Sequence, residues 1–367
     1  MRSTRGRGGS LLAVCFAAVA GLMALPACEP ATHHHQYVVS QLKPTALRIY
    51  DMDDGHRLLR TVPLPQLVGK LAGMAGSAVT DRLYLTSTGD EAGGVLLAYD
   101  LRSNAVAWTR TYTPGVDSLC ATPDGSKLYM SSGEHASSQY FFVLDASDGD
   151  VLGTVPVGAP QTHNAVCNVD GTRAYLSSIR TPYLTVADTR DDHVIRRVGP
   201  FGDSIRPFTI NGRNTLAIVN VNRLIGFEVG DITTGQKLWR VTTPGYPYDG
   251  SMLNPSHGVA LTPDEREVWV VDSQNKRLHV FDVTGLPGAK PTKVATISLT
   301  KNPYWITFSL DGRYAYPATG DVIDTRTRKK VFTIVDRASK QVQVDLKAGD
   351  PVRVGSRHGL GYVTAPP

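Results

Sequence analysis

The feature that most constrains the fold is a short motif that recurs along nearly the whole chain. Each copy is an alternating apolar run that ends in an acidic residue, as in LLAYD and LHVFD. Seven copies follow one another at spacings of 40 to 54 residues, and their acids are Asp51, Asp100, Asp145, Asp188, Glu228, Asp282 and Asp324. A period of this size indicates a repeat architecture, in which each unit is one supersecondary element.

Each repeat contains four apolar runs separated by Gly, Asp or Pro. One unit consists of SLCATPDG, SKLYMSSG, YFFVLDASDG and VLGTVPVG, and alternating runs between turn residues predict β-strands. No helical period of comparable length occurs, which argues against a doubly wound α/β fold. The sequence therefore predicts an all-β, seven-bladed β-propeller of four-stranded blades, because radial repetition leaves few exposed sheet edges.

The two ends of the chain are expected to meet in one blade. After residue 36 the chain opens on QYVVS, which matches the second strand of a repeat, so the first blade lacks an inner strand. Near the C-terminus, RHGLGYVTAP resembles the inner-strand segment SHGVALTPDE. We expect the C-terminal strand to join the N-terminal blade and close the ring; the alternative is that this tail only covers the outside.

Two sets of repeated residues are expected to be structural. Tight turns precede the second strands as PDG, VDG, PDE and LDG, where Asp satisfies local backbone groups and Gly supplies unusual dihedral angles. Aromatic residues recur at matching places in the second strands and are expected to pack between blades. They are Tyr84, Tyr129, Tyr175, Trp269 and Tyr316.

The first 27 residues have the composition of a secretory signal peptide. Three arginines precede an apolar run from Leu11 to Leu25, which is too short for a membrane span. The run closes with Leu-Pro-Ala-Cys at Cys28, which resembles the site where bacterial lipoproteins are cleaved and acylated, although Pro26 departs from that pattern. We predict lipidation at Cys28, with simple cleavage and release as the alternative.

Residues 28–36 are predicted to be a flexible tether to a single propeller domain at 37–367. The tether contains His33, His34 and His35, but adjacent histidines in a flexible segment rarely make a specific metal site. Attached lipid would place the protein at a membrane surface through its N-terminal anchor alone. The expected location is the periplasm or cell envelope.

Charge excludes one class of partner. Removing the three signal-peptide arginines leaves 35 of the 38 basic residues against 33 acids, whereas nucleic-acid binding requires a clear basic excess. The mature chain, expected to be a monomer, retains Cys120 and Cys167 besides Cys28. These two lie on neighbouring inner strands, where either a disulfide or two buried free thiols are consistent with the sequence.

The repeat resembles a known family. Its period, the second strands of the YVxS type and the third strands of the xVxVxD type are similar to those of the YVTN/YncE-type seven-bladed propellers. The stretches IRPFTINGRNTLAIVNVNRLIGFEVGDITTGQKL and PSHGVALTPDEREVWVVDSQNKRLHVFD carry the resemblance most specifically. It implies an exported bacterial propeller without an assigned reaction.

Candidate ligand-binding residues lie just before the inner strands, because these segments converge at the mouth of a propeller channel. They are Asp117, His163, Arg206, His257, Tyr304, Trp305 and His358. Three imidazoles from separate blades, at His163, His257 and His358, are also the candidate catalytic residues and the candidate ligands of a divalent transition metal. The alternative is ordinary polar lining. An insertion at Tyr246–Gly250 is the candidate lid.

Three functions remain open at this stage. The first is a non-catalytic binding module that holds an envelope protein, peptide or glycan at the channel mouth. The second is a metal-dependent or lactonase-like hydrolase that uses the three histidines. The third is an accessory to a periplasmic dehydrogenase, although the chain contains no CxxCH haem attachment, GxSxG elbow, P-loop or GxGxxG fingerprint.

Overall fold

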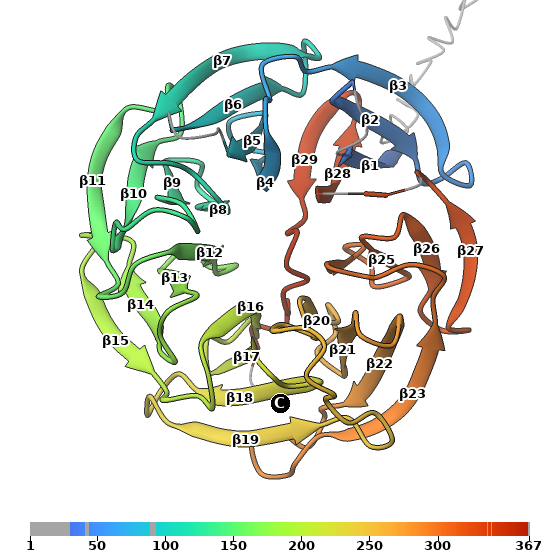
Figure 1. Ribbon diagram of the computed structural model, residues 1–367. Helices are drawn as coiled ribbons and strands as arrows, with labels where there is room; N and C mark the ends of the chain where they lie inside the picture. Colours follow the sequence, from blue (N-terminus) through green and yellow to red (C-terminus); the bar gives the residue numbers. More distant parts are fainter. Residues whose placement is uncertain (1–29, 41–43, 89–92, 336, 339, 366–367) are drawn as a thin grey trace, which may run out of the picture. The chain divides into compact units, whose positions relative to one another are not determined.

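The predicted repeats form seven antiparallel sheets arranged around a central channel (Figure 1). The computed structural model describes residues 30–40, 44–88, 93–335, 337–338 and 340–365 of the 367-residue chain. All of its regular structure is β-strand, and the described part contains no helix long and apolar enough to cross a membrane. The predicted all-β, seven-bladed β-propeller is confirmed.

Six blades contain four strands each, in chain order from the channel outwards. The second blade contains β4 (Lys70–Ser77), β5 (Arg82–Thr88), β6 (Gly94–Asp100) and β7 (Ala105–Tyr112). The third contains β8 (Leu119–Ala121), β9 (Lys127–Ser131), β10 (Tyr140–Asp145) and β11 (Val151–Pro156). The fourth contains β12 (Thr162–Cys167), β13 (Arg173–Ser178), β14 (Leu184–Asp188) and β15 (Val194–Val198). The fifth blade contains β16 (Ile205–Ile210), β17 (Leu216–Val221), β18 (Gly226–Asp231) and β19 (Lys237–Thr242). The sixth contains β20 (Val259–Leu261), β21 (Glu267–Asp272), β22 (Arg277–Asp282) and β23 (Thr292–Ser298). The seventh contains β24 (Ile306–Phe308), β25 (Tyr314–Pro317), β26 (Asp321–Asp324) and β27 (Lys329–Thr333).

The first blade is built from both ends of the chain. From the channel outwards it contains β29 (Asp350–Val354), β28 (Lys340–Lys347), β1 (Thr32–Ser40), β2 (Ala46–Asp51) and β3 (Arg57–Pro63). Antiparallel pairing of β1 with β28 closes the ring, in register from Thr32 opposite Lys347 to Val39 opposite Lys340. The predicted closure is therefore confirmed, and the blade has one strand more than predicted.

Two details of the predicted closure differ from the structure. The inner strand is β28, because its alternating sequence places Val342 and Val344 in the core. The segment RHGLGYVTAP, predicted to be that strand, lies instead in an irregular stretch, residues 355–365, that crosses the channel (Figure 1). We call this stretch the crossing tail.

The predicted tether is also shorter than expected. Residues 32–36 form the first half of β1, since the facing edges of β2 and β28 both require a partner strand. His34 Nδ1 lies 2.7 Å from Asp345 Oδ1, and His35 stands opposite Asp51. The histidine run is thus held in a sheet.

Blade-to-blade contacts form the hydrophobic core. The described residues contain seven apolar clusters, and each lies at the junction of two neighbouring blades. The five repeated aromatics of the second strands are fully buried there, as predicted. Their polar atoms often bond the next blade: Tyr84 Oη donates to Ala146 O, and Tyr316 Oη lies 2.9 Å from His56 Nε2.

The turns before the second strands have the structural role predicted for them. Asp124 Oδ1 accepts from the Thr122 hydroxyl and the Ser126 amide, and Asp311 makes the equivalent bonds in the seventh blade. One register assignment was wrong, because Asp231, and not Glu228, faces the start of the second strand in the fifth blade. Glu228 is instead a buried acceptor for Arg240.

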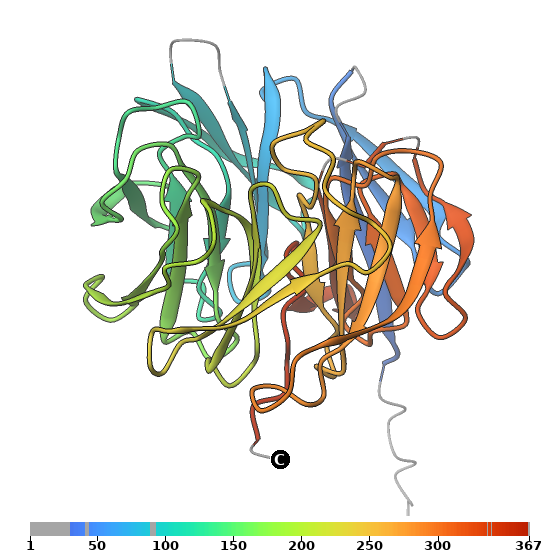
Figure 2. The ribbon, with the colours of Figure 1, turned by 60° about the horizontal axis from the view of Figure 1, so that its bottom comes forward.

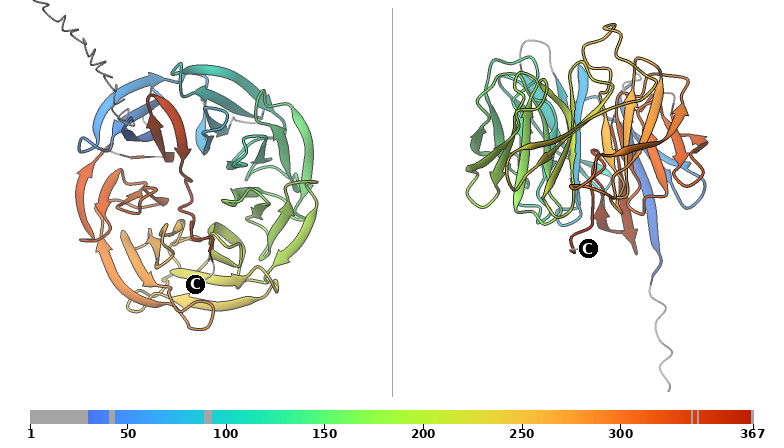
Figure 3. Two further views of the ribbon diagram at one scale, coloured as in Figure 1. Left: turned by 180° about the vertical axis from the view of Figure 1, so that it is seen from behind. Right: turned by 90° about the horizontal axis from the view of Figure 1, so that it is seen from below.

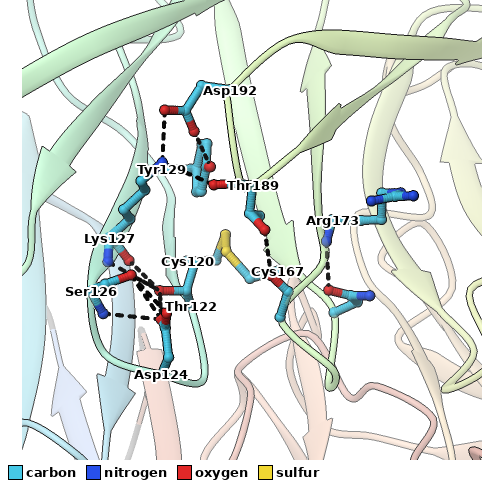
Figure 4. Close-up of a disulfide and its surroundings, with 12 residues drawn as sticks. Cys120, Thr122, Asp124, Ser126, Lys127, Tyr129, Cys167, Arg173, Thr189 and Asp192 are labelled. Carbon is cyan, nitrogen blue, oxygen red and sulfur yellow. Dashed lines mark hydrogen bonds and ion pairs between the residues drawn. A yellow bond between two sulfur atoms is a disulfide. The ribbon is translucent and has the colours of Figure 1, made fainter.

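Cys120 of β8 and Cys167 of β12 form a disulfide between the third and fourth blades (Figure 4). Their Cα atoms are 5.5 Å apart, within the usual range. Tyr129 and Lys127, which both bond Asp192, join the same two blades. Of the two states left open by the sequence, the structure contains the disulfide.

The channel has two ends, which the chain uses differently. We call the end that carries the turns between inner and second strands the turn face, and the opposite end the mouth. The crossing tail leaves on the turn face, the face from which β1 starts (Figures 2 and 3). The segments that precede the inner strands lie at the mouth.

We predict that the disulfide stabilises the ring. The two cysteines are separated by 47 residues, and loop closure of that length contributes about 4 kcal/mol to the free energy of unfolding. A Cys120→Ala/Cys167→Ala variant should lose up to that amount in urea unfolding. Alkylation of both cysteines in the unfolded, unreduced protein would contradict the pairing.

Candidate functional site

Irregular inner strands bring polar residues to the channel mouth. The pairing of β12 with β13 shifts between Thr162 and Ala165, which leaves His163 and Asn164 outside the regular ladder. The pairing of β16 with β17 shifts in the same way around Arg206. Bulges of this kind re-aim side chains and are common next to functional sites.

A network of two largely buried acids, a buried histidine and an exposed lysine lies at the mouth. His163 Nδ1 is 2.5 Å from Asp117 Oδ2 and 3.6 Å from Glu134 Oε2. Lys70 Nζ donates to Glu134 Oε1 over 2.7 Å. Both side chains of the Asp117–His163 pair are about 95% buried, so the pair is shielded from competing water.

Glu134 is ionised throughout the physiological pH range. Burial alone would raise the pKa of its carboxyl group, but the neighbouring His163 and the Lys70 ammonium lower that pKa to about 2. The same contact keeps the pKa of Lys70 above its usual value, although burial acts in the opposite direction. The contacts among Asp117, His163, Glu134 and Lys70 therefore join the four side chains into one electrostatic network.

The free nitrogen of His163 faces a second imidazole. His163 Nε2 and His257 Nδ1 are both buried atoms without a hydrogen-bond partner among the described residues, and the ring centroids are 5.9 Å apart. Burial, reinforced by His163 and Arg206, lowers the pKa of His257 well below its usual value. His257 is therefore neutral near pH 7.

Trp305 connects the mouth to the crossing tail. Its ring lies edge-on to His257 at 4.9 Å and to His358 at 6.1 Å between centroids. Lys340 Nζ lies 4.1 Å and Arg357 Cζ 4.3 Å from its centre. Because cations bind to the face of an indole ring, Trp305 positions both cations. Tyr304 is 41% exposed at the rim.

The crossing tail fixes Arg357 and His358 inside the channel. Arg357 donates to Ala72 O and Asn164 Oδ1, and its Nε donates to His358 Nε2 over 3.2 Å. The far end of the tail is held where Gly359 O accepts from the Leu261 amide. Gly359 has φ of +57°, and a Cβ there would meet Ala260 at 2.5 Å, so only glycine fits.

Three buried basic side chains near the mouth form no ion pair with a carboxylate among the described residues, although Asp117 and Glu134 act on them at longer range. Lys340, Arg206 and Arg357 are each more than 90% buried, and none forms an ion pair with a described residue. Burial lowers the pKa of Arg357 to about 10 and that of Lys340 well below its usual value, and Arg357 adds to the effect on Lys340. Each cation is therefore destabilised in the absence of an anion.

The structure brings most of the predicted site residues together. Close contacts link Asp117, His163, His257, Trp305 and His358 in series. Tyr304 lies at the edge of the site, 6.5 Å from His257 between ring centroids. Arg206 donates to Asn222 and lies close enough to His257 to lower the pKa of that imidazole. His358 reaches the site through the crossing tail, whereas the sequence had placed it on an inner strand.

Sequence reasoning missed four charged residues of the site. Lys70, Lys340 and Arg357 lie at or next to the ends of channel-lining strands, and Glu134 lies on the loop after β9. The position of Glu134 could have been predicted from the sequence, because the loops between second and third strands also reach the mouth. Lys340 and Arg357 could not be found while the closing strand was misplaced.

The described residues contain one group of side chains that could hold a metal ion. Among the described residues, one group of three side chains, Asp117, Glu134 and His163, has ligating atoms within 4.8 Å of one another. His257 and His358 do not belong to such a group. Lys70 already bonds Glu134, and Asp117 already bonds Nδ1 of His163. A metal ion held by these three side chains would have to displace both contacts.

Comparison with known proteins identifies the class of fold. Among solved structures, the chain is similar to hydrazine synthase of Kuenenia stuttgartiensis, with a TM-score of 0.59 and 13% sequence identity over 80% of this chain and 90% of that chain. Identity this low shows the fold alone, that of a β-propeller. No protein-family model and no curated protein matches the sequence.

We predict a pH-dependent contribution of Glu134 to stability. Its folded pKa of about 2 lies below the unfolded value of 4.5, a difference worth on the order of 3 kcal/mol. This stability is complete above pH 4.5 and is lost as the pH falls through 2. Glu134→Gln should therefore destabilise the protein at pH 7 and approach the parent at low pH in urea unfolding.

The matched control is Asp150→Asn, which changes a carboxylate whose side chain is 67% exposed. Its effect should stay within about 0.5 kcal/mol at each pH. A stability difference between Glu134→Gln and the parent that does not change with pH would show that the Glu134 carboxylate is not held as described.

Proposed function

We propose that this protein is a binding propeller that holds a ligand with an acidic group at the channel mouth. The observation that carries the proposal is the set of three buried cations, Lys340, Arg206 and Arg357, without a carboxylate partner. Burying an unpaired charge is strongly unfavourable. An anionic ligand would supply the missing partner and recover that free energy.

The acids and histidines beside the three cations make the site selective for particular anionic ligands. The two carboxylates at the mouth are already engaged, Glu134 by Lys70 and Asp117 by His163. They therefore leave the three cations available to a ligand. His163 Nε2 and His257 Nδ1 are free to bond polar groups of the same ligand, which would fix its orientation.

The protein's location is part of the proposal. The basic, then apolar N-terminus and the cysteine at position 28 support export and lipidation at the bacterial envelope; Cys28 lies outside the described residues. The second- and third-strand motifs support membership of the YVTN/YncE-type propellers. We propose a monomer whose ligand is an envelope peptide, protein or glycan with an acidic group.

Lys340→Met tests the proposal by separating binding from stability. Methionine keeps the length of the side chain and removes the buried charge, so the free energy of unfolding should stay the same or rise. Affinity for citrate, used as a small acidic probe, should fall at least tenfold, because a charge-assisted bond contributes about 1.5–3 kcal/mol. Calorimetric titration at low salt measures this affinity.

The matched control is Lys290→Met, which removes the charge of an exposed lysine on a surface turn. It should leave citrate affinity within about twofold of the parent. Absence of citrate binding by the parent, or equal affinities for the parent and Lys340→Met, would contradict the proposed anion site.

A second candidate function is hydrolysis, which the Asp117–His163 contact favours. The contact of His163 Nδ1 with Asp117 Oδ2 favours the imidazole tautomer with its proton on Nδ1, which leaves the Nε2 lone pair free. That atom could take a proton from a water molecule as its oxygen attacks an acyl carbonyl, and return the proton to the leaving alkoxide oxygen as the acyl–oxygen bond breaks. Nearby Lys340 would stabilise the oxyanion.

The test of this candidate is hydrolysis of p-nitrophenyl acetate and γ-butyrolactone. Asp117→Asn and His163→Gln should each lower the rate at least a hundredfold, with His193→Gln, an exposed histidine on the turn between β14 and β15, as the control. No rate above that of buffer in the parent would rule out this activity on such substrates. Metal in the untagged parent and none in the His163/His257/His358 triple alanine variant would assign the chemistry to a metal.

A further inference from the structure

A cavity lies on the turn-face side of the crossing tail. Its volume is about 290 Å³, near the lower end of the range for small-molecule sites. The turn-side halves of β4, β8 and β12 form one wall, and β29 with the crossing tail forms the other. The disulfide cysteines are part of the first wall. The crossing tail thus separates this cavity, which we call the turn-side cavity, from the mouth.

The wall of the turn-side cavity is mostly apolar. Met74, Leu119, Val354 and Leu360 are among the aliphatic side chains that line it. Apolar walls of this kind bind the hydrocarbon part of a ligand by removing it from water. The lining therefore fits a ligand with an apolar body.

The lining contains two arginines and one histidine, Arg353, Arg357 and His358, and no Asp, Glu or Lys. Arg353 is 3.9 Å from Asp345, but Arg357 forms no ion pair with a described residue. Three of the five N–H groups of Arg357 make hydrogen bonds, which leaves two as free donors.

His358 supplies a further free donor. It is 97% buried and is held parallel to Phe208, with 6.4 Å between ring centroids. Its Nε2 accepts from Arg357 Nε over 3.2 Å, so the neutral ring carries its proton on Nδ1. No described residue accepts that proton. Free donors and a basic residue on an otherwise apolar wall fit a single acidic group.

We propose that the turn-side cavity is a second binding site, for a small amphipathic carboxylate such as a medium-chain carboxylic acid. The carboxylate binds at Arg357 and His358, and the hydrocarbon chain lies along β4, β8 and β12 towards the turn face. This inference shares Arg357 with the proposed anion site at the mouth. The two can still be tested separately, because Ala78 lines the turn-side cavity and Lys340 does not.

The experiment compares octanoate with octanol by calorimetric titration of the purified full-length protein. Octanoate should bind, and octanol, which has the same chain without the charge, should bind at least tenfold more weakly. Butyrate should also bind at least tenfold more weakly, because its chain fills less of the cavity. Absence of octanoate binding, or equal binding of octanol, would overturn the proposal.

Two variants locate the site. Ala78 lines the cavity on a partly exposed turn, so Ala78→Phe should fill the space, retain the fold and weaken octanoate binding at least tenfold. His358→Phe should weaken it by a similar factor while keeping the ring packed on Phe208. Val151→Phe, on an exposed outer strand away from the cavity, is the matched control.

Citrate titrations distinguish this inference from the proposed function. Ala78→Phe should bind citrate like the parent, and Lys340→Met should bind octanoate like the parent. Octanoate affinity unchanged by both Ala78→Phe and His358→Phe would place octanoate elsewhere and overturn the proposal, whatever the outcome for citrate.

Discussion

The pairing of β1 with β28 is the interaction on which the rest of the structure depends. It joins residues from the two ends of the chain over eight opposed pairs and completes the ring, so that every blade has a neighbour on both sides. The seven apolar clusters between blades require that closure, because an open ring would expose two sheet faces to water. Closure also carries the chain back to the channel, where β29 and the crossing tail continue.

The crossing tail converts an open channel into two chemical environments. On the mouth side it contributes Arg357 beside Trp305 and Lys340. On the turn face it forms one wall of a largely apolar cavity. A segment of irregular backbone can occupy the middle of the channel because its amides and carbonyls bond the inner strands, as Gly359 and Gly361 do. The same hydrogen bonds fix the positions of the site residues on the tail.

Most of the fold could be predicted from the sequence, because the strand period, the buried aromatics and the Asp–Gly turns all repeat. The errors occurred where the repeat is broken. Glu228 was taken for a register acid because IGFE imitates the motif, whereas the ladder uses Asp231. The tail was taken for a strand because RHGLGYVTAP imitates one, although β28 already occupies that position.

The site was predicted in part for a related reason. Residues counted back from the turns, such as Asp117 and His163, could be found because their positions follow the repeat. Glu134 lies on the loop after β9, at a position that no repeated motif marks, and Lys340 becomes part of the site only through ring closure. Charge balance in three dimensions decides what the site can bind, and a count of acids and bases along the chain does not contain that information.

We propose that the unpaired cations at the channel mouth form an anion site. Anomalous diffraction from crystals soaked in sodium bromide can locate such a site, because bromide reports where the protein accepts negative charge without reference to any particular ligand. We expect an ordered bromide in contact with Lys340 or Arg206 at the mouth. Bromide bound only at exposed lysines and arginines on the outer strands, with none at the mouth, would contradict it.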